Sequence, residues 1–178
     1  MSQRYYSGPS PSRGPGPLVT GLAWALALVA IALQIAFPLV PDSSRASLAI
    51  AIVLSFFAAS VVHASARHGI LGFLLVGFVV PAIGLAAEAV GVHTGLPFGD
   101  YTYGDSLGMQ LFHVPAVVPL AWAMMAYPTY VAASTLTRSR WWTALIGGWS
   151  LMAWDLFLDP MMVNLGGWKW LSTKSAIP

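Results

Sequence analysis

Long apolar runs separated by short polar stretches dominate the chain. Each run is close to the ~20 residues that a helix needs to cross a hydrocarbon core. A single segment in lipid satisfies its backbone hydrogen bonds only as a helix. The pattern therefore predicts an all-α fold, a polytopic transmembrane helix bundle within one domain of residues 17–170. About five spans are expected, over residues 18–40, 46–66, 70–92, 114–136 and 141–163.

The ends of the chain differ from this bundle. Residues 1–16 are rich in Ser, Gly, Pro and Arg, a composition that predicts a disordered tail rather than a signal peptide. Residues 171–178 are expected to form a short polar tail.

Lys and Arg indicate how the bundle is oriented, because cytoplasmic loops carry more of them. With the N-terminus in the cytoplasm, five cations lie inside: Arg4, Arg13, Arg67, Arg138 and Arg140. Three lie outside: Arg45, Lys169 and Lys174. This bias predicts that the loop at 93–113 lies on the non-cytoplasmic face of the cell membrane.

The composition supports a membrane location and excludes several functions. Hydrophobic residues make up 57% of the chain and charged residues only 8%, against about 25% charged residues in a typical soluble domain. The net charge of +2 comes from scattered residues, so no basic cluster is available to bind nucleic acid. The chain has no Cys, which excludes thiolate catalysis, disulfides and cysteine-held iron–sulfur clusters.

Acidic residues are rare, and some fall where lipid would otherwise be expected. Asp42 and Asp105 are expected to be solvated. The others are Glu88, Asp100, Asp155 and Asp159. At about 1.5 Å per residue, Glu88 and Asp159 each lie roughly 27 Å along helices that enter from the same face, and Asp155 roughly 21 Å. We therefore expect Glu88 and Asp159 to approach each other, with Asp155 one turn deeper on the same helix face as Asp159.

Carboxyl groups that are buried near one another resist ionisation, so one can stay protonated while its neighbour is charged. That combination supplies the donor and the acceptor that general acid–base catalysis needs. The candidate catalytic residues are Glu88, Asp155, Asp159 and Asp100. The alternative interpretation is structural, with the acids linking helices through hydrogen bonds. Trp168 and Trp170 are interpreted as an anchor at the membrane interface.

Three ordered blocks resemble the membrane carotenoid biosynthesis proteins of the CruF type. The first is Glu88 followed by TGLPFGDYTY at 94–103. The second is VP at 114–115 with VPL at 118–120 and Trp122. The third is AWDLFLDPMM at 153–162, extended by GWKW at 167–170. The similarity covers residues 82–170, about half of the chain.

This resemblance implies a hydratase that adds water to the terminal double bond of an acyclic carotenoid and forms a tertiary alcohol. Such a reaction needs an acid, a base or water-holding group, and apolar or aromatic walls, but no metal and no other cofactor. The implied partners are the carotenoid and the lipid bilayer, with other carotenoid enzymes as further candidates. The candidate substrate-binding residues are His93, Thr94, Pro97, Phe98, Tyr101, Tyr103, Trp122 and Trp154.

The chain departs from the family pattern near its C-terminal end, and two other functions compete with the hydratase interpretation. Members of the family are expected to continue beyond the Trp-x-Trp block with further helices. Either this chain is a fragment or a C-terminally shortened form, or the terminal block is dispensable. One competitor is an intramembrane prenyltransferase, because Asp155 and Asp159 have the spacing of a magnesium-diphosphate motif. The sequence offers that enzyme neither a second Asp-rich segment nor cationic partners for the diphosphate. The other competitor is a proton-coupled carrier or a non-catalytic membrane scaffold.

Overall fold

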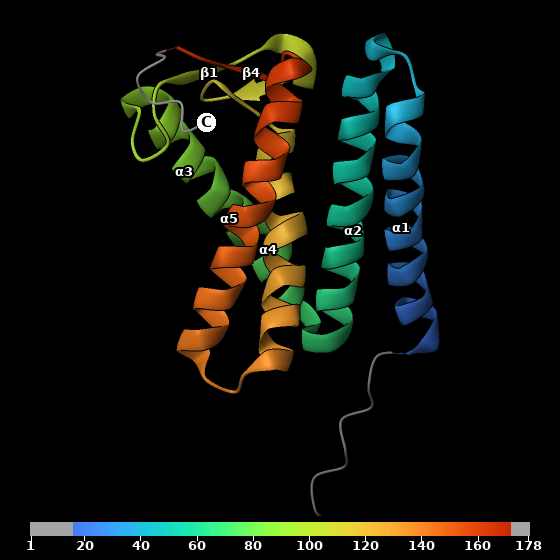
Figure 1. Ribbon diagram of the computed structural model, residues 1–178. Helices are drawn as coiled ribbons and strands as arrows, with labels where there is room; N and C mark the ends of the chain where they lie inside the picture. The colour runs from blue at the N-terminus through green and yellow to red at the C-terminus, as the bar shows by residue number, and fades with distance from the viewer. Residues whose placement is uncertain (1–15, 172–178) are drawn as a thin grey trace, which may run out of the picture.

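The computed structural model describes residues 16–171, and most of these residues are helical (Figure 1). Residues 1–15 of the tail predicted at 1–16, and residues 172–178 of the polar tail predicted at 171–178, lie outside the described part. The α-helices are α1 (Pro17–Ala36), α2 (Asp42–Leu74), α3 (Val80–Thr94), α4 (Val117–Leu136) and α5 (Arg140–Asn164). A π-helical turn at Leu75–Val79 joins α2 to α3, and short 3-10 turns occupy Phe37–Leu39 and Asp105–Leu107.

The chain reverses direction within the segment assigned to α2. Gly69 has φ 61° and ψ −145°, a backbone conformation that only glycine adopts at little cost. After this residue, a Cβ on Gly77 would lie 3.9 Å from the side chain of Val61, and a Cβ on Gly72 would overlap the carbonyl oxygen of Ala64. Residues so far apart along one straight helix could not touch, so the segments on either side of Gly69 run side by side (Figure 1). The predicted break between residues 66 and 70 corresponds to this turn.

The helices pack in a fixed order, with α4 at the centre. Helix α1 packs on α2, α2 packs on α4, and both α3 and α5 pack on α4. Helices α3 and α5 form no comparable interface with each other, and they run at an angle to each other, with α5 crossing in front of α3 in Figure 1. The buried core at the α2 and α4 interface consists of Ala64, Val76 and Tyr127, with Val61 and Val131 packed against it.

Two helical stretches are long and apolar enough to cross a membrane: Pro17–Leu39 and Asp42–Thr94. Only 11% and 17% of their most apolar windows are buried inside the protein, so most of their hydrocarbon faces outward. Length and composition of two such stretches are weak evidence for a membrane protein, and they do not fix the number of crossings.

The fold is mostly helical, as predicted, and two short ribbons accompany the helices. Strand β1 (Tyr101–Tyr103) pairs antiparallel with β4 (Trp168–Trp170), and β2 (Gln110–Leu111) pairs antiparallel with β3 (Val114–Pro115). In the first ribbon Tyr101 lies opposite Trp170 and Tyr103 lies opposite Trp168. This ribbon therefore joins the segment that follows α3 to the segment that follows α5, at one end of the bundle (Figure 1).

Candidate functional site

Glu88 is the best-connected acid among the described residues. It lies on α3 with only 8% of its surface exposed. Its Oε2 accepts hydrogen bonds from the hydroxyls of Tyr101 at 2.6 Å and Tyr103 at 2.8 Å. Its Oε1 accepts one from Nε1 of Trp122 on α4 at 2.9 Å. A carboxylate only accepts hydrogen bonds, so these three donors match it and tie α3 to both β1 and α4.

Two glycines on α3 make room for these donors. Gly84, Glu88 and Gly91 are spaced so that they share one helix face. A Cβ on Gly84 would lie 2.9 Å from Cγ of Trp122, and one on Gly91 would lie 2.7 Å from the hydroxyl oxygen of Tyr101. Any larger side chain at either position would push a donor away from Glu88.

Asp159 on α5 is held in a similar way by the other strand of the ribbon. Its Oδ1 accepts a hydrogen bond from Nε1 of Trp168 at 2.6 Å, and its Oδ2 accepts one from Nε1 of Trp170 at 3.3 Å. Helix α5 ends at Asn164, and Gly166, with φ 70°, turns the chain back into β4. This turn brings the indoles of Trp168 and Trp170 back beside Asp159, which precedes them in the chain.

The four rings of the β1–β4 ribbon form one continuous aromatic face, which we call the aromatic ribbon: Tyr101, Tyr103, Trp168 and Trp170. Alternate residues of a strand point to the same side. The rings of Tyr101 and Trp170 are 5.6 Å apart between centroids, and those of Tyr103 and Trp168 are 5.9 Å apart. Burial, with Glu88 beside it, raises the pKa of both tyrosine hydroxyls, so they remain protonated donors.

Asp155 differs from the other two acids. It lies one turn before Asp159 on α5, is exposed, and interacts electrostatically with both Glu88 and Asp159. In the described part of the chain no hydrogen bond holds its side chain, whereas Glu88 and Asp159 each have aromatic donors. The three carboxyls expected from helix depth therefore gather around the aromatic ribbon. The ribbon mediates their approach, since no hydrogen bond joins Glu88 directly to Asp159 among these residues.

A family model described as "Carotenoid biosynthesis protein" matches residues 47–176, well over half of the chain. The chain belongs to the carotenoid biosynthesis protein family. It is also 34% identical, over 102 residues, to a protein of Haloarcula japonica named bisanhydrobacterioruberin hydratase. That alignment covers 54% of this chain and 34% of the relative, so the chain matches about a third of the relative's length. No solved structure matches.

The candidate residues at the end of α3 and in the loop after it lie beside the carboxyl cluster rather than in it. His93 bonds through Nδ1 to the carbonyl oxygen of Ala89, and the Thr94 hydroxyl bonds to that of Val90, both at 2.7 Å. Both side chains and Pro97 are exposed. Phe98 is closer to the cluster, since its ring meets that of Tyr101 edge-on at 6.5 Å.

The two other candidates have different surroundings. Asp100 is exposed, its carboxyl lies against Gly95, and its carbonyl oxygen accepts a hydrogen bond from the Leu171 amide at 2.8 Å. It therefore closes the end of the aromatic ribbon and does not join the other three acids. Trp154 is half-buried on α5, next to Asp155, with no hydrogen bond among the described residues.

Trp168 and Trp170 are the site residues that the sequence interpretation missed. The sequence indicated only an interface anchor for them, and the structure adds that their indole N–H groups donate hydrogen bonds to Asp159. A signal was present, because Trp-x-Trp and Tyr-x-Tyr both place aromatic residues at every second position, which is typical of strands. Two such strands can share one aromatic face only by pairing.

Proposed function

We propose that the chain carries the active site of a membrane hydratase that adds water to the terminal double bond of an acyclic carotenoid. One observation carries the proposal: Asp155 has no hydrogen-bond partner among the described residues, although it interacts electrostatically with two acids that do. Family membership and the relative named a hydratase support a carotenoid as the substrate.

Asp155 is the proton donor in this proposal. Both oxygens of Asp159 already accept indole N–H groups, and Glu88 accepts three hydrogen bonds. Asp155 is the acid that can turn toward a substrate. Two neighbouring negative charges favour its protonated form in a low-dielectric site. It would donate its proton to the less substituted carbon of the terminal double bond, which leaves a tertiary cation on the other carbon.

Water then attacks the cation and completes the alcohol. The attacking water loses one proton, which Glu88 accepts in this scheme, and the proton returns through the carboxyl cluster to Asp155. One alkene and one water give one tertiary alcohol, and the enzyme is unchanged. The cation is stabilised by the nearby carboxylates and by the faces of the aromatic ribbon.

An elongated substrate has an apolar approach to this position. Helices α3 and α5 do not pack together, and both expose large apolar side chains, including Ile83 and Val90 on α3 and Trp149, Met152 and Leu156 on α5. A polyene lying between the two helices would bring its end under the aromatic ribbon. The proposal includes five spans, a cytoplasmic N-terminus, and the ribbon at the opposite membrane face.

The test is expression of the chain in a host that accumulates lycopene, followed by mass analysis of the pigments. Product heavier by one water per reacted end is expected, and Asp155→Asn should abolish it. Because the chain matches about a third of the relative's length, the same variants are made in a natural full-length family member if the chain alone is inactive. Normal hydration by Asp155→Asn at equal membrane insertion would refute the mechanism.

A second candidate, a non-catalytic scaffold, is favoured by the same hydrogen bonds. Five aromatic donors hold Glu88 and Asp159 and link α3, α4, α5 and the ribbon, an arrangement that can serve stability alone. The two candidates differ at Asp155, where a scaffold predicts no loss of function on substitution. The prenyltransferase is not supported, since the oxygens of Asp159 are engaged by indoles rather than open to a metal ion.

A further inference from the structure

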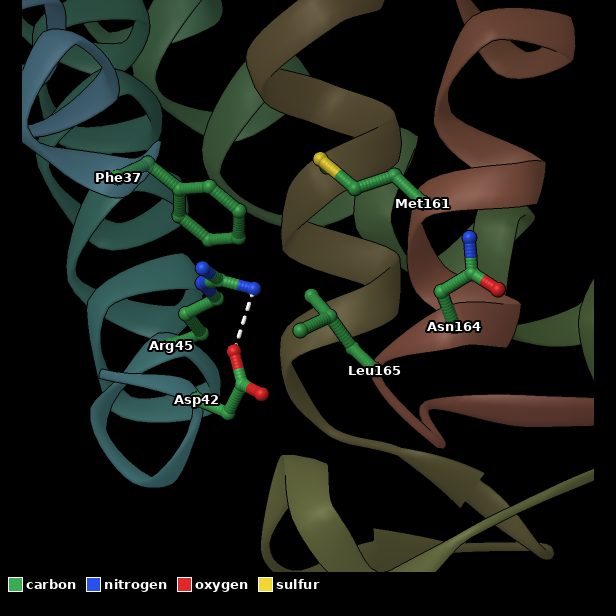
Figure 2. Close-up of a pocket in the computed structure, with 6 residues that line it drawn as sticks. All are labelled: Phe37, Asp42, Arg45, Met161, Asn164 and Leu165. Carbon is green, nitrogen blue, oxygen red and sulfur yellow. Dashed lines mark ion pairs between the residues drawn. The ribbon is translucent and has the colours of Figure 1, made fainter. Parts of the chain in front are cut away.

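A cavity of about 310 Å³ lies away from the carboxyl cluster, between the start of α2 and the end of α5 (Figure 2). Its lining residues are Phe37, Asp42, Arg45, Met161, Asn164 and Leu165. Met161 and Asn164 lie on the face of α5 opposite to Asp155 and Asp159, and Leu165 follows the end of the helix directly. The cavity is therefore separate from the proposed active site, although both lie near the same end of α5.

The polar groups of the cavity come from opposite walls. Arg45 and Asp42, one helical turn apart on α2, form an ion pair through Nη1 and Oδ1, and Figure 2 shows them on one side of the cavity with Leu165 opposite them and Asn164 farther away on the same wall as Leu165. Asp42 is largely exposed and Arg45 is partly buried. The Nε of Arg45 is buried and has no hydrogen-bond acceptor among the described residues.

A buried donor without an acceptor is unfavourable. A ligand oxygen in the cavity could accept hydrogen bonds from the free N–H groups of Arg45 after a small rotation of the guanidinium, and these bonds would stabilise the rotated side chain. Arginine presents a planar fork of N–H groups that matches phosphate oxygens better than a point charge does.

The charged residues that line the cavity determine which kind of phosphate-containing ligand fits it. The Asp42–Arg45 pair has no net charge, so a simple anion drawn to Arg45 would be repelled by Asp42. A ligand with a phosphate and an ammonium group can satisfy both residues. The remaining lining, Phe37, Met161 and Leu165, is apolar and suits the first carbons of an acyl chain.

We infer that this cavity binds the head group of a zwitterionic phospholipid with a primary ammonium, placing its phosphate beside Arg45 and its ammonium beside Asp42. The inference rests on the proposed membrane placement, but not on the hydration reaction. Arg45 lies at the start of α2, just after the apolar stretch Pro17–Leu39 ends. If both stretches cross the bilayer, the cavity lies at the depth of the lipid head groups.

The test uses the purified chain in detergent with added phosphatidylethanolamine, phosphatidylcholine or phosphatidylglycerol, and bound lipids are counted by native mass spectrometry. Phosphatidylethanolamine should bind best, because phosphatidylcholine has no ammonium N–H and phosphatidylglycerol has no ammonium. Arg45→Gln should weaken its binding at least about tenfold, the loss expected for a hydrogen-bonded charge. Asp42→Asn should shift the preference toward phosphatidylglycerol, since the repulsion of an anion is removed.

Two control variants show whether lipid binding depends on this cavity. Arg138→Gln removes a cation at the α4–α5 connection and should leave lipid binding unchanged, and Asp155→Asn should do the same, which makes the result independent of hydration. If Arg45→Gln does not fold, Arg45→Lys, which keeps the charge but loses the fork, should still lower the affinity. Equal binding of the three lipids, unchanged binding by the Arg45 variants, or displacement of lipid by millimolar inorganic phosphate would each overturn the inference.

Discussion

Tyr103 and Trp168 lie opposite each other in the aromatic ribbon, with ring centroids 5.9 Å apart, yet they bind acids on different helices. The hydroxyl of Tyr103 donates to Glu88 on α3, and the indole of Trp168 donates to Asp159 on α5. Since α3 and α5 do not pack on each other, this pair of rings is a bridge between them. The bridge therefore ties the positions of the two carboxyls to each other.

Trp168→Phe tests the bridge. The substitution keeps an aromatic ring but removes the N–H that donates to Asp159, so a part-buried carboxyl oxygen loses its partner. We expect a loss of about 1–3 kcal/mol in the free energy of unfolding, the usual cost of an unmet hydrogen bond. Trp149→Phe, at an exposed α5 position with no hydrogen bond among the described residues, is the matched control. Thermal unfolding in detergent measures both, and equal stability of the two variants would contradict the bridge.

Gly84→Ala and Gly91→Ala test the close approach of the donors to Glu88. A methyl group at these positions would overlap Trp122 or Tyr101. Each variant should be destabilised by about 1–3 kcal/mol, as is typical when a packed site receives an extra carbon. Gly148→Ala is the control, because a Cβ there meets nothing within 4 Å, and it should be neutral or slightly stabilising. A Gly91→Ala variant as stable as Gly148→Ala would show that Tyr101 can move without cost.

The helices could be predicted from the sequence because burial in lipid or in a core needs long apolar runs, and these runs are visible locally. The turn at Gly69 was also visible, as a polar break around Arg67. The carboxyl cluster followed from helix geometry, because acids are rare in this chain and rise per residue is constant. The helices and the turn depend on neighbours in the sequence, and the depth of each acid depends only on its position along its own helix.

The aromatic ribbon could not be predicted in the same way. Its strands have three residues each, too short for a clear periodic signal, and each is stabilised only by a partner far away in the chain. Tryptophan is also common at membrane interfaces, so Trp168 and Trp170 fitted a simpler interpretation. Only pairing with Tyr101 and Tyr103 gives these indoles their position beside Asp159.

The orientation of the bundle gives a further prediction, which a pair of single cysteines can test. The native chain has no Cys, so Ser106→Cys and Ser139→Cys each provide one labelling site, and both positions are exposed. If residues 93–113 lie on the non-cytoplasmic face, an impermeant reagent added outside intact cells should label position 106 and not position 139. Labelling of position 139 alone would reverse the orientation. Labelling of both positions, or of neither, would argue against an odd number of spans between residues 106 and 139.

The acids of the cluster should respond differently to amide substitution, and this difference is the sharpest prediction. Glu88→Gln replaces one acceptor oxygen by an N–H₂ group that faces aromatic donors, so it should lower both stability and hydration. Asp159→Asn should do the same more weakly, because the amide oxygen can still accept from Trp168. Both losses of hydration would be expected from a structural role as well as from a catalytic one.

Asp155→Asn separates the two roles, because no hydrogen bond among the described residues depends on that carboxyl. The variant should insert and unfold like the native chain but lose hydration by at least ~10²-fold, as expected when a general acid is removed. Asp105→Asn, which changes an exposed carboxyl in the loop, should be silent in both measurements. The readouts are product per inserted protein and thermal stability of the same preparation. Loss of hydration in step with loss of stability would make Asp155 structural, whereas loss of hydration alone requires that its proton takes part in the reaction.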